Sequence, residues 1–357
     1  MEIKKIKLPF KIKGPILALG PQLKNTICFA KDNLAYLSRI HSDLSNLPDF
    51  LNFEKDLKYF LKNKPRAIAY DLHPEYASTK YASAHLFGYS PVAVQHHHAH
   101  IASCMVENGL KNQKVIGVAF DGTGLGSDDT IWGAEFLVCD YKNFLRKAHL
   151  KEIPLLGGAQ AILEPWRLAA AWLNFPGEID KKQLLRKIYK SGINSPLASS
   201  MGRLFDAVGS LVLNKKIAGF EAELAIELEK IATGYKLQAI GYPFAIIKRE
   251  DKYILDPGKM FKVIVRDIKR KKPKARIAFC FHLTVAKMIK KTCLILRKET
   301  NINKVILSGG VFQNKLLLKL ALDLLYREGF KVFTQKKISC NDSGISLGQA
   351  VIAGIKG

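Results

Sequence analysis

The sequence predicts an α/β protein with two similar lobes around a cleft, and three observations indicate this fold. Its 357 residues are enough for two domains or lobes of ordinary size. A meander of short apolar strands followed by alternating helices and strands occurs twice along the chain. Glycine-bearing turns also follow two of the predicted strands, at 121–126 and at 308–310. Such repeated alternation is typical of layered α/β domains and predicts a duplicated architecture.

The first round of predicted elements lies before residue 110. Short apolar runs separated by glycine, proline and Asp-Asn turns indicate strands, and apolar residues at helical spacing indicate helices. The predicted strands are 16–19, 26–30, 34–37, 67–70 and 91–94, and the predicted helices are 43–61, 75–87 and one running from the histidine cluster to about Gly109.

The second round begins at Lys114 and repeats the pattern on a larger scale. Its predicted elements are strands 115–120 and 133–139, a mainly helical stretch about 164–230, strand 305–307, helix 316–326, strand 331–333 and a C-terminal helix that opens at 341–344. We therefore expect one lobe at 14–112 and a second at 113–357, with a mainly helical insertion at about 157–280.

The composition excludes a mostly disordered chain, since 48% of the residues are hydrophobic and only 24% are charged. No window approaches about 18 consecutive apolar residues, so we expect no transmembrane span. We also expect no membrane partner. The basic N-terminus lacks the apolar run and cleavage site of a signal peptide. The six cysteines form no CxxC pair and are typical of reduced thiols. These features predict a cytoplasmic protein.

The net charge of +25 suits a nucleic acid, an acidic membrane surface or an acidic partner protein. Lysine far outnumbers arginine and is scattered along the chain, and no nucleic-acid-binding signature accompanies it, so we expect no nucleic-acid partner. The one dense basic run, at 269–276, is either a solvated linker or a docking patch.

Four of the nine histidines occur in Gln95-His96-His97-His98-Ala99-His100, directly after a predicted strand. At the start of a helix, His96 and His100 would lie four residues apart on one face, a spacing at which two imidazoles can bind one metal ion. The alternative is a polar helix start with exposed imidazoles. Four histidines together after an apolar strand favour the metal site.

Two imidazoles are too few for a metal centre, and carboxylates at strand ends are the natural further ligands. Asp121 directly follows strand 115–120, and Asp342 lies between strand 331–333 and the last helix. In open α/β sheets, ligands bind beyond the carboxyl ends of the strands. Each aspartate could instead cap a helix or shape a turn. Two nitrogen and two oxygen donors would suit Fe, Mn or Zn.

The glycine-bearing turns predict anion binding. In Asp121-Gly122-Thr123-Gly124, the glycines would let backbone N–H groups approach a phosphate, and the threonine hydroxyl adds a donor. Gly309 and Gly310 lie between a strand and a helix, and Asn314 follows four residues later. Two such turns suggest a nucleotide held in the cleft from two sides, whereas each turn alone could be purely structural.

Several longer motifs carry a family resemblance that covers about residues 14–357. In order they are LKNTICFAKDN, YDLHPEYASTKYA, QHHHAHIAS, FDGTGLG, EPWR, SSMGRLFDA, ILSGGVFQN and NDSGISLGQA. Together they resemble the C-terminal, Kae1-like domain of the hydrogenase maturation carbamoyltransferase HypF. This resemblance implies the duplicated actin-like ATPase/sugar kinase (ASKHA) fold.

The resemblance also implies a chemistry. The family's metal ligands fall on His96, His100, Asp121 and Asp342, the four residues that the spacing predicts. Its adenine-nucleotide contacts fall on the glycine-bearing turns, on Asn314 and on Glu221. The implied reaction passes a carbamoyl group from carbamoyl-adenylate to the C-terminal cysteine of HypE, on the way to the cyanide ligands of nickel-iron hydrogenase.

Two kinds of departure from the family bear on these expectations. The domains that make carbamoyl-adenylate in full-length HypF have no counterpart in this sequence, which implies a separate YrdC-like protein as the donor source. In addition, Ala159, Ala222 and Ser343 stand where relatives often have Asp, Gly and Gly. The alternatives are therefore an O- or N-carbamoyltransferase that acts on a small molecule or RNA, and a non-catalytic nucleotide-binding remnant.

Overall fold

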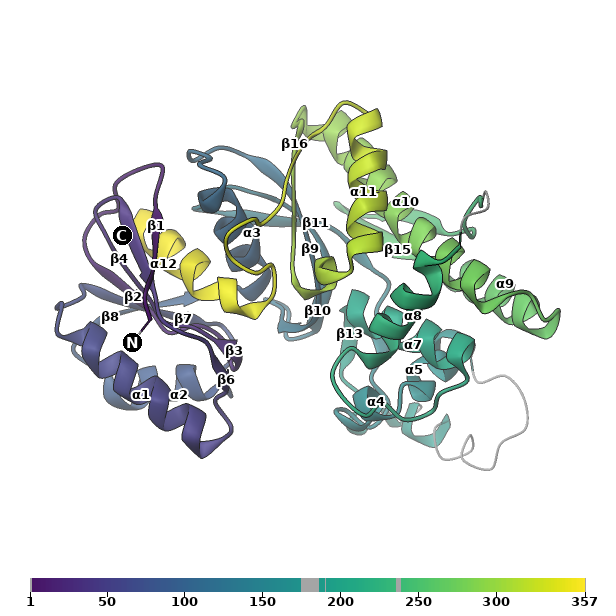
Figure 1. Cartoon of the computed structure of the whole chain (residues 1–357), viewed down its shortest axis with the longest axis horizontal. Helices are drawn as coiled ribbons and strands as arrows, with labels where there is room; N and C mark the ends of the chain where they lie inside the picture. Colours follow the sequence, from purple (N-terminus) through teal and green to yellow (C-terminus); the bar gives the residue numbers. More distant parts are fainter. Residues whose placement is uncertain (1, 175–185, 190, 236–238, 357) are drawn as a thin grey trace.

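The computed structural model describes residues 2–174, 186–189, 191–235 and 239–356. Two large β-sheets lie side by side in it, each with helices packed on it (Figure 1). The order in the N-terminal sheet is β1 (Lys4–Lys7), β5 (Leu34–Leu37), β4 (Cys28–Lys31), β2 (Ile16–Ala18), β7 (Ala67–Asp71) and β8 (Ser90–Val94). A separate pair is formed by β3 (Leu23–Asn25) and β6 (His41–Asp43).

The second sheet is larger and follows the order β14 (Ala245–Arg249), β15 (Lys252–Asp256), β11 (Phe144–Leu150), β10 (Ile131–Cys139), β9 (Val115–Leu125), β16 (Lys304–Ser308) and β17 (Lys331–Phe333). Off this path, β13 (Leu197–Ser200) pairs with β10 and with β12 (Ile153–Pro154).

The two sheets share one topology. In the N-terminal sheet, β2, β4 and β5 form an antiparallel meander, and β7 and β8 add in parallel beside β2. In the second sheet, β9, β10 and β11 form the same meander, and β16 and β17 add in parallel beside β9. Both units thus place their strands in the order 3-2-1-4-5, so the predicted duplicated α/β architecture is confirmed.

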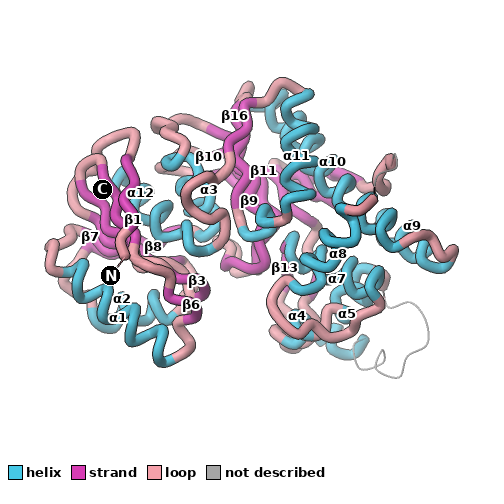
Figure 2. The backbone as a smooth tube through the Cα atoms, viewed as in Figure 1, coloured by secondary structure: helices cyan, strands magenta, loops and turns pink. Residues whose placement is uncertain are grey.

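The helices cover the sheets and separate them. The helices whose bounds lie within the described residues are α1 (Leu47–Leu61), α2 (Ala77–His85), α3 (His96–Glu107), α4 (Gln160–Leu163), α5 (Trp166–Trp172), α7 (Met201–Leu213), α8 (Glu223–Thr233), α9 (Gly258–Lys269), α10 (Lys274–Thr300), α11 (Lys315–Arg327) and α12 (Ile345–Lys356), with 3₁₀ turns η1 (Gly310–Gln313) and η2 (Asp342–Gly344). Figure 2 shows α1 and α2 on the outer side of the N-terminal sheet, with α3 and α12 between the two sheets.

Helix α12 ties the end of the chain to its beginning, because it packs on β2, β4 and β7 of the N-terminal sheet and crosses α3. At the crossing, a Cβ on Gly348 would lie 2.0 Å from the Ala99 carbonyl oxygen, so only glycine allows this approach. The division at residues 112 and 113, with the insertion at about 157–280, stays a prediction.

Most of the predicted strands and helices occur in the structure, and the differences have local causes. The helix expected from Asp43 begins at Leu47, because residues 41–43 form β6 and Pro48 suits the first turn of a helix. The stretch expected to be helical at 164–230 contains the strand β13, and its residues 175–185 and 190 lie outside the described part. Strands β1, β3, β11, β12, β14 and β15 were not predicted either.

The basic run at 269–276 joins the end of α9 to the start of α10, which favours the interpretation as a linker between helices. Among the described residues, no helix is both long enough and apolar enough to cross a membrane.

Candidate metal centre

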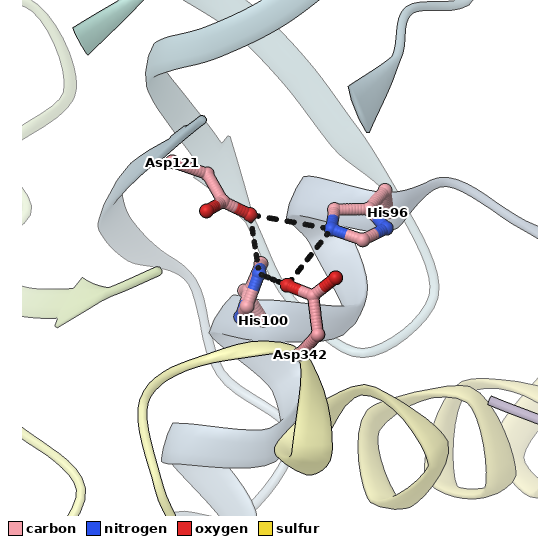
Figure 3. Close-up of side chains that lie close together, drawn as sticks. All are labelled: His96, His100, Asp121 and Asp342. Atoms are coloured by element: carbon pink, nitrogen blue, oxygen red, sulfur yellow. Dashed lines mark hydrogen bonds and ion pairs between the residues drawn. The ribbon is translucent and has the colours of Figure 1, made fainter. Parts of the chain in front are cut away.

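Four of the predicted site residues meet at one point between the sheets. His96 and His100 lie on the first turns of α3, Asp121 lies in β9, and Asp342 is the first residue of η2. One donor atom from each residue lies within 4.8 Å of the other three (Figure 3). The structure therefore brings together the set that the spacing predicts.

The donor atoms face one another directly. The Nε2 atoms of His96 and His100 lie 3.4 and 3.1 Å from Asp121 Oδ2. Both Nε2 atoms lie 3.7 Å from Asp342 Oδ1 (Figure 3). The histidines are fully buried, whereas the Asp342 side chain keeps 20% of its surface exposed. The cluster thus has one side open to a ligand.

Local backbone chemistry sets these positions. The Gln95 side chain accepts a hydrogen bond from the His98 N–H at 2.9 Å, which caps α3 and starts the helix at His96. Because the helix begins there, His96 and His100 project from the same face one turn apart. The Gly122 N–H donates to Asp121 Oδ1 at 2.8 Å, which leaves Oδ2 directed at the histidines.

The carboxylates and imidazoles of the cluster shift the pKa values of their neighbours. Burial and the neighbouring Asp121 carboxylate raise the pKa of Asp342. Burial also acts to raise the pKa of Asp121, but its hydrogen bonds with His100 and His96 hold that pKa well below the usual range. Burial acts to lower the pKa of His96, yet Asp71, Asp121 and Asp342 raise it well above the usual value. A proton on His96 offsets part of the negative charge here.

The donor set fits a divalent transition metal. Two imidazole nitrogens and two carboxylate oxygens converge, and the two carboxylates compete for positive charge in a buried setting, which a dication would satisfy. Fe, Mn and Zn all accept such nitrogen and oxygen ligands. The metal assignment of these four residues stays a prediction that this geometry supports.

The second glycine-bearing turn lies beside the cluster. A Cβ on Gly310 would lie 3.0 Å from Asp121 Oδ1, so Gly310 borders the metal centre. Gly309 has φ +102°, and a Cβ there would lie 2.2 Å from the Phe120 carbonyl oxygen. Gly309 therefore requires glycine for its positive φ and its close approach to the Phe120 backbone.

The first glycine-bearing segment differs from its prediction in backbone form. Residues 121–125 are not a loop after the strand, because β9 continues through them and pairs with β10. A Cβ on Gly124 would lie 2.6 Å from His97 Cε1 and 3.0 Å from His96 Cδ2, so this glycine makes room for the imidazoles. Thr123 is exposed and Gly122 is half-buried. Their contact with a phosphate stays a prediction.

The other predicted nucleotide contacts lie outside the cluster and already have protein partners. Asn314 Oδ1 accepts from the Leu317 N–H at 2.8 Å and caps α11, and its Nδ2 lies 2.9 Å from His282 Nε2. The exposed Glu221 pairs with Lys24, with 2.7 Å between Oε2 and Nζ. Their roles toward a nucleotide also stay predictions.

Two residues with a clear relation to the cluster were given no role in the sequence analysis. Asp71 ends β7 and lies 2.8 Å from His96 Nδ1 through its Oδ2 atom. Burial acts to lower the pKa of Lys24, but Glu221 and the nearby Asp342 and Asp121 carboxylates raise it. An aspartate at a strand end and a lysine in a basic chain are both too common in sequence to identify such roles.

The fold and the cluster together define a class: a duplicated, two-lobed α/β protein whose lobes meet at a His-Asp centre. A family model described as the Kae1-like domain of HypF matches residues 11–107, and one described as a carbamoyltransferase Kae1-like domain, second subdomain, matches residues 117–349. The chain belongs to the HypF carbamoyltransferase family.

Individual relatives agree. The chain is 35% identical to a carbamoyltransferase HypF of Synechocystis, covering 96% of this chain and 48% of that protein. It is 33% identical to a HypF homolog of Cupriavidus necator, covering 95% of this chain and 91% of that protein. The chain spans about half the length of most of the curated relatives that it matches.

Solved structures confirm the fold. A full-length HypF in its phosphate- and nucleotide-bound form superposes with a TM-score of 0.92 at 41% identity, covering 98% of this chain and 57% of that one. HypF of T. kodakarensis gives a TM-score of 0.87 at 29% identity, covering 98% of this chain and 49% of that one. The predicted two-lobed α/β fold is confirmed in its Kae1-like form.

Proposed function

We propose that this chain transfers a carbamoyl group from carbamoyl-adenylate to the C-terminal cysteine of a HypE-like protein during [NiFe]-hydrogenase maturation. The observation that carries the proposal is the buried His96–His100–Asp121–Asp342 cluster in a chain of the HypF family. A divalent metal held there would supply Lewis-acid polarisation of a carbamoyl or phosphate oxygen.

The chain's own side chains prepare the site for an anionic donor. Lys24 lies in β3, which contacts η2 and its Asp342. Burial acts to lower its pKa, but Glu221, and after it Asp342 and Asp121, raise it, so Lys24 remains a cation beside the cluster. A cation there favours the phosphate of an adenylate. The bare backbone at Gly310 leaves space next to Asp121 for that ligand.

The nucleophile comes from the acceptor. The thiolate sulfur attacks the carbamoyl carbon, a C–S bond forms, the C–O bond to the phosphate breaks, and its electron pair leaves with AMP. Five of the chain's cysteines are buried, and burial raises the pKa of every one of the six. Cys340, the half-buried one, has its pKa raised by burial to about 11. A protonated thiol is a weak nucleophile, which agrees with an external thiolate.

Reconstitution tests the proposal. The full chain is loaded with Zn²⁺, Mn²⁺ or Fe²⁺ and mixed with chemically made carbamoyl-adenylate and HypE, and the mass of HypE is followed for one carbamoyl increment. We expect the increment with the wild type. His96→Ala should weaken metal binding by more than about 100-fold and abolish the transfer, since removing a ligand costs more than disturbing its support.

The surface histidine His85 offers a matched control, because it is exposed on α2, away from the cluster. His85→Ala should leave both metal binding and the transfer unchanged. If HypE gains no mass while the chain still binds metal and adenylate, the proposed acceptor is wrong, and small molecules and RNA become the acceptors to try. If neither ligand binds, the chain is not a carbamoyltransferase of this kind.

A further inference from the structure

Asp71 is a buried carboxylate that contacts His96 on the side of the ring opposite the metal centre. It is the last residue of β7 and is completely buried. Its Oδ2 atom lies 2.8 Å from His96 Nδ1, and its Oδ1 atom accepts a hydrogen bond from the His73 N–H at 3.0 Å. Within the described part of the chain, no lysine or arginine forms an ion pair with Asp71. The carboxylate is therefore held by one backbone amide and one imidazole.

The two histidines of the cluster differ in this respect. His96 has Asp71 behind it, whereas the Nδ1 atom of His100 is buried without a hydrogen-bond partner among the described residues. His100 is anchored through its backbone instead, where its carbonyl accepts from the Ser308 hydroxyl at 3.1 Å. Of these two rings, only His96 therefore has a carboxylate at its Nδ1 atom, on the side away from the cluster.

The contact between Asp71 Oδ2 and His96 Nδ1 determines which ring nitrogen of His96 carries a proton. An ionised carboxylate can only accept, so the short contact requires the proton of His96 to be on Nδ1. As a metal ligand the ring must be neutral. With the remaining proton on Nδ1, its free electron pair then lies on Nε2, the atom that faces Asp121 and Asp342. Carboxylates in this position fix the tautomer and orientation of metal-binding histidines and strengthen them as ligands.

We propose that Asp71 is a positioning residue for the metal centre, which holds His96 in the Nδ1–H tautomer and directs its Nε2 atom at the cluster. The inference rests on the metal centre of the proposed function and adds to it a residue that would not touch the metal. His96, supported in this way, becomes the stronger of the two imidazole ligands.

Metal affinity measured on the full chain tests this role. The metal-stripped protein is titrated with Zn²⁺ against a chromogenic chelator, and Kd is compared between variants. Asp71→Ala should raise Kd about 10- to 100-fold, the usual cost of losing such support. Asp71→Asn keeps an acceptor oxygen without the charge, so its Kd should lie between those of the wild type and Asp71→Ala.

Asp56 provides the matched control. It is also a buried aspartate of the N-terminal lobe with a histidine partner, since its Oδ2 atom lies 3.1 Å from His41 Nε2. Asp56→Ala should lower stability and leave the Zn²⁺ Kd within about threefold of the wild-type value. Circular dichroism and the unfolding midpoint of each variant show whether it is folded before titration, and Asp71→Asn decides if Asp71→Ala does not fold.

A second readout separates positioning from a merely structural role. With Co²⁺ in place of Zn²⁺, the visible d–d absorption band should shift in Asp71→Asn and stay unchanged in Asp56→Ala, because only the first alters a ligand's orientation. A wild-type Kd in Asp71→Asn together with an unshifted band overturns the proposal. If the wild type itself binds none of Zn²⁺, Mn²⁺ or Fe²⁺, the metal centre is refuted, and Asp71 has no such role.

Discussion

The two sets of predicted site residues differ in what their polar atoms contact. In the metal centre, the Nε2 atoms of His96 and His100 and the facing carboxylate oxygens contact one another, and within the described ranges no further partner of these atoms is found. In the predicted nucleotide set, the polar atoms already bind the protein: Asn314 caps α11 and contacts His282, and Glu221 pairs with Lys24. The donors of the first set converge on one point, whereas the Asn314 and Glu221 side chains of the second set already have partners in the protein.

This difference shows in the charge states of two completely buried histidines. His96 faces three carboxylates that raise its pKa well above the usual value despite burial. His282 has one acceptor, the Ala278 carbonyl oxygen at 2.7 Å from Nδ1, and one donor, the Asn314 amide at Nε2. Burial lowers its pKa to about 4. A neutral imidazole can form both hydrogen bonds of His282. The carboxylates around His96 are instead stabilised by a positive charge on that ring or at the centre of the cluster.

The largest expected effect that tests the contrast between His96 and His282 is the change of the protein's stability with pH that His282 causes. Its folded pKa is about 4 against about 6.5 in the unfolded chain. The unfolded state therefore binds the proton at a higher pH than the folded state does. The contribution of neutral His282 to the free energy of unfolding is complete above about pH 6.5 and is lost as the pH falls to about 4. The loss should reach about 3 kcal/mol, and urea unfolding between pH 7 and 4 measures it.

His282→Leu is the control for this slope. The variant starts less stable, because the Asn314 amide and the Ala278 carbonyl lose their partner, but its free energy of unfolding should change less between pH 6.5 and 4. His98, whose pKa burial also lowers to about 4, still contributes in both proteins. Equal slopes in variant and wild type would show that His282 titrates normally and would remove the contrast with His96.

The sequence predicts the cluster better than it predicts its surroundings, and the reason is physical. Strand ends and an i, i+4 pair follow directly from apolar runs and helical spacing, so the four donors could be placed together. The hairpin of β14 and β15 could not, because its partly exposed residues show no clean alternation of buried and exposed positions. Short pairings such as β13 depend on distant partners that periodicity does not reveal.

Asp71 and the segment 121–125 show the same limit at the site. A strand that ends in aspartate is indistinguishable in sequence from one that ends in a turn, and only the fold brings Asp71 to His96. Asp-Gly-Thr-Gly is typical of a loop, but β10 pairs with it and keeps it in the sheet. In both cases a tertiary contact overrides the local signal.

Asn314 gives the next effect in size. Asn314→Ala removes the α11 cap and the contact with His282 and should lower the free energy of unfolding by about 2 kcal/mol. Asn314→Ser keeps a good capping side chain and should cost only about 1 kcal/mol. Urea unfolding of both variants measures the difference.

The same pair of variants tests the predicted nucleotide contact. Both lack the amide, so if Asn314 lies against adenosine, their AMP dissociation constants should rise equally despite their unequal stabilities. Unchanged AMP affinity in both, by calorimetry, would show that the Asn314 amide serves the protein alone, as its two internal hydrogen bonds indicate.

The smallest effect concerns Ala222, the residue directly before α8. Its backbone has φ +62°, in the left-handed region that costs a residue with a Cβ about 1–2 kcal/mol. Ala222→Gly removes that strain but adds about 0.4–1 kcal/mol of unfolded-chain entropy, so a net gain of about 0.5 kcal/mol is expected. The neighbouring α8 substitution Ala225→Gly, inside a helix, should instead lose about 1 kcal/mol. If Ala222→Gly also tightens AMP binding, the strained backbone beside Glu221 belongs to the nucleotide site. The metal-centre residues and the predicted nucleotide contacts would then differ less than their present hydrogen bonds and ion pairs indicate.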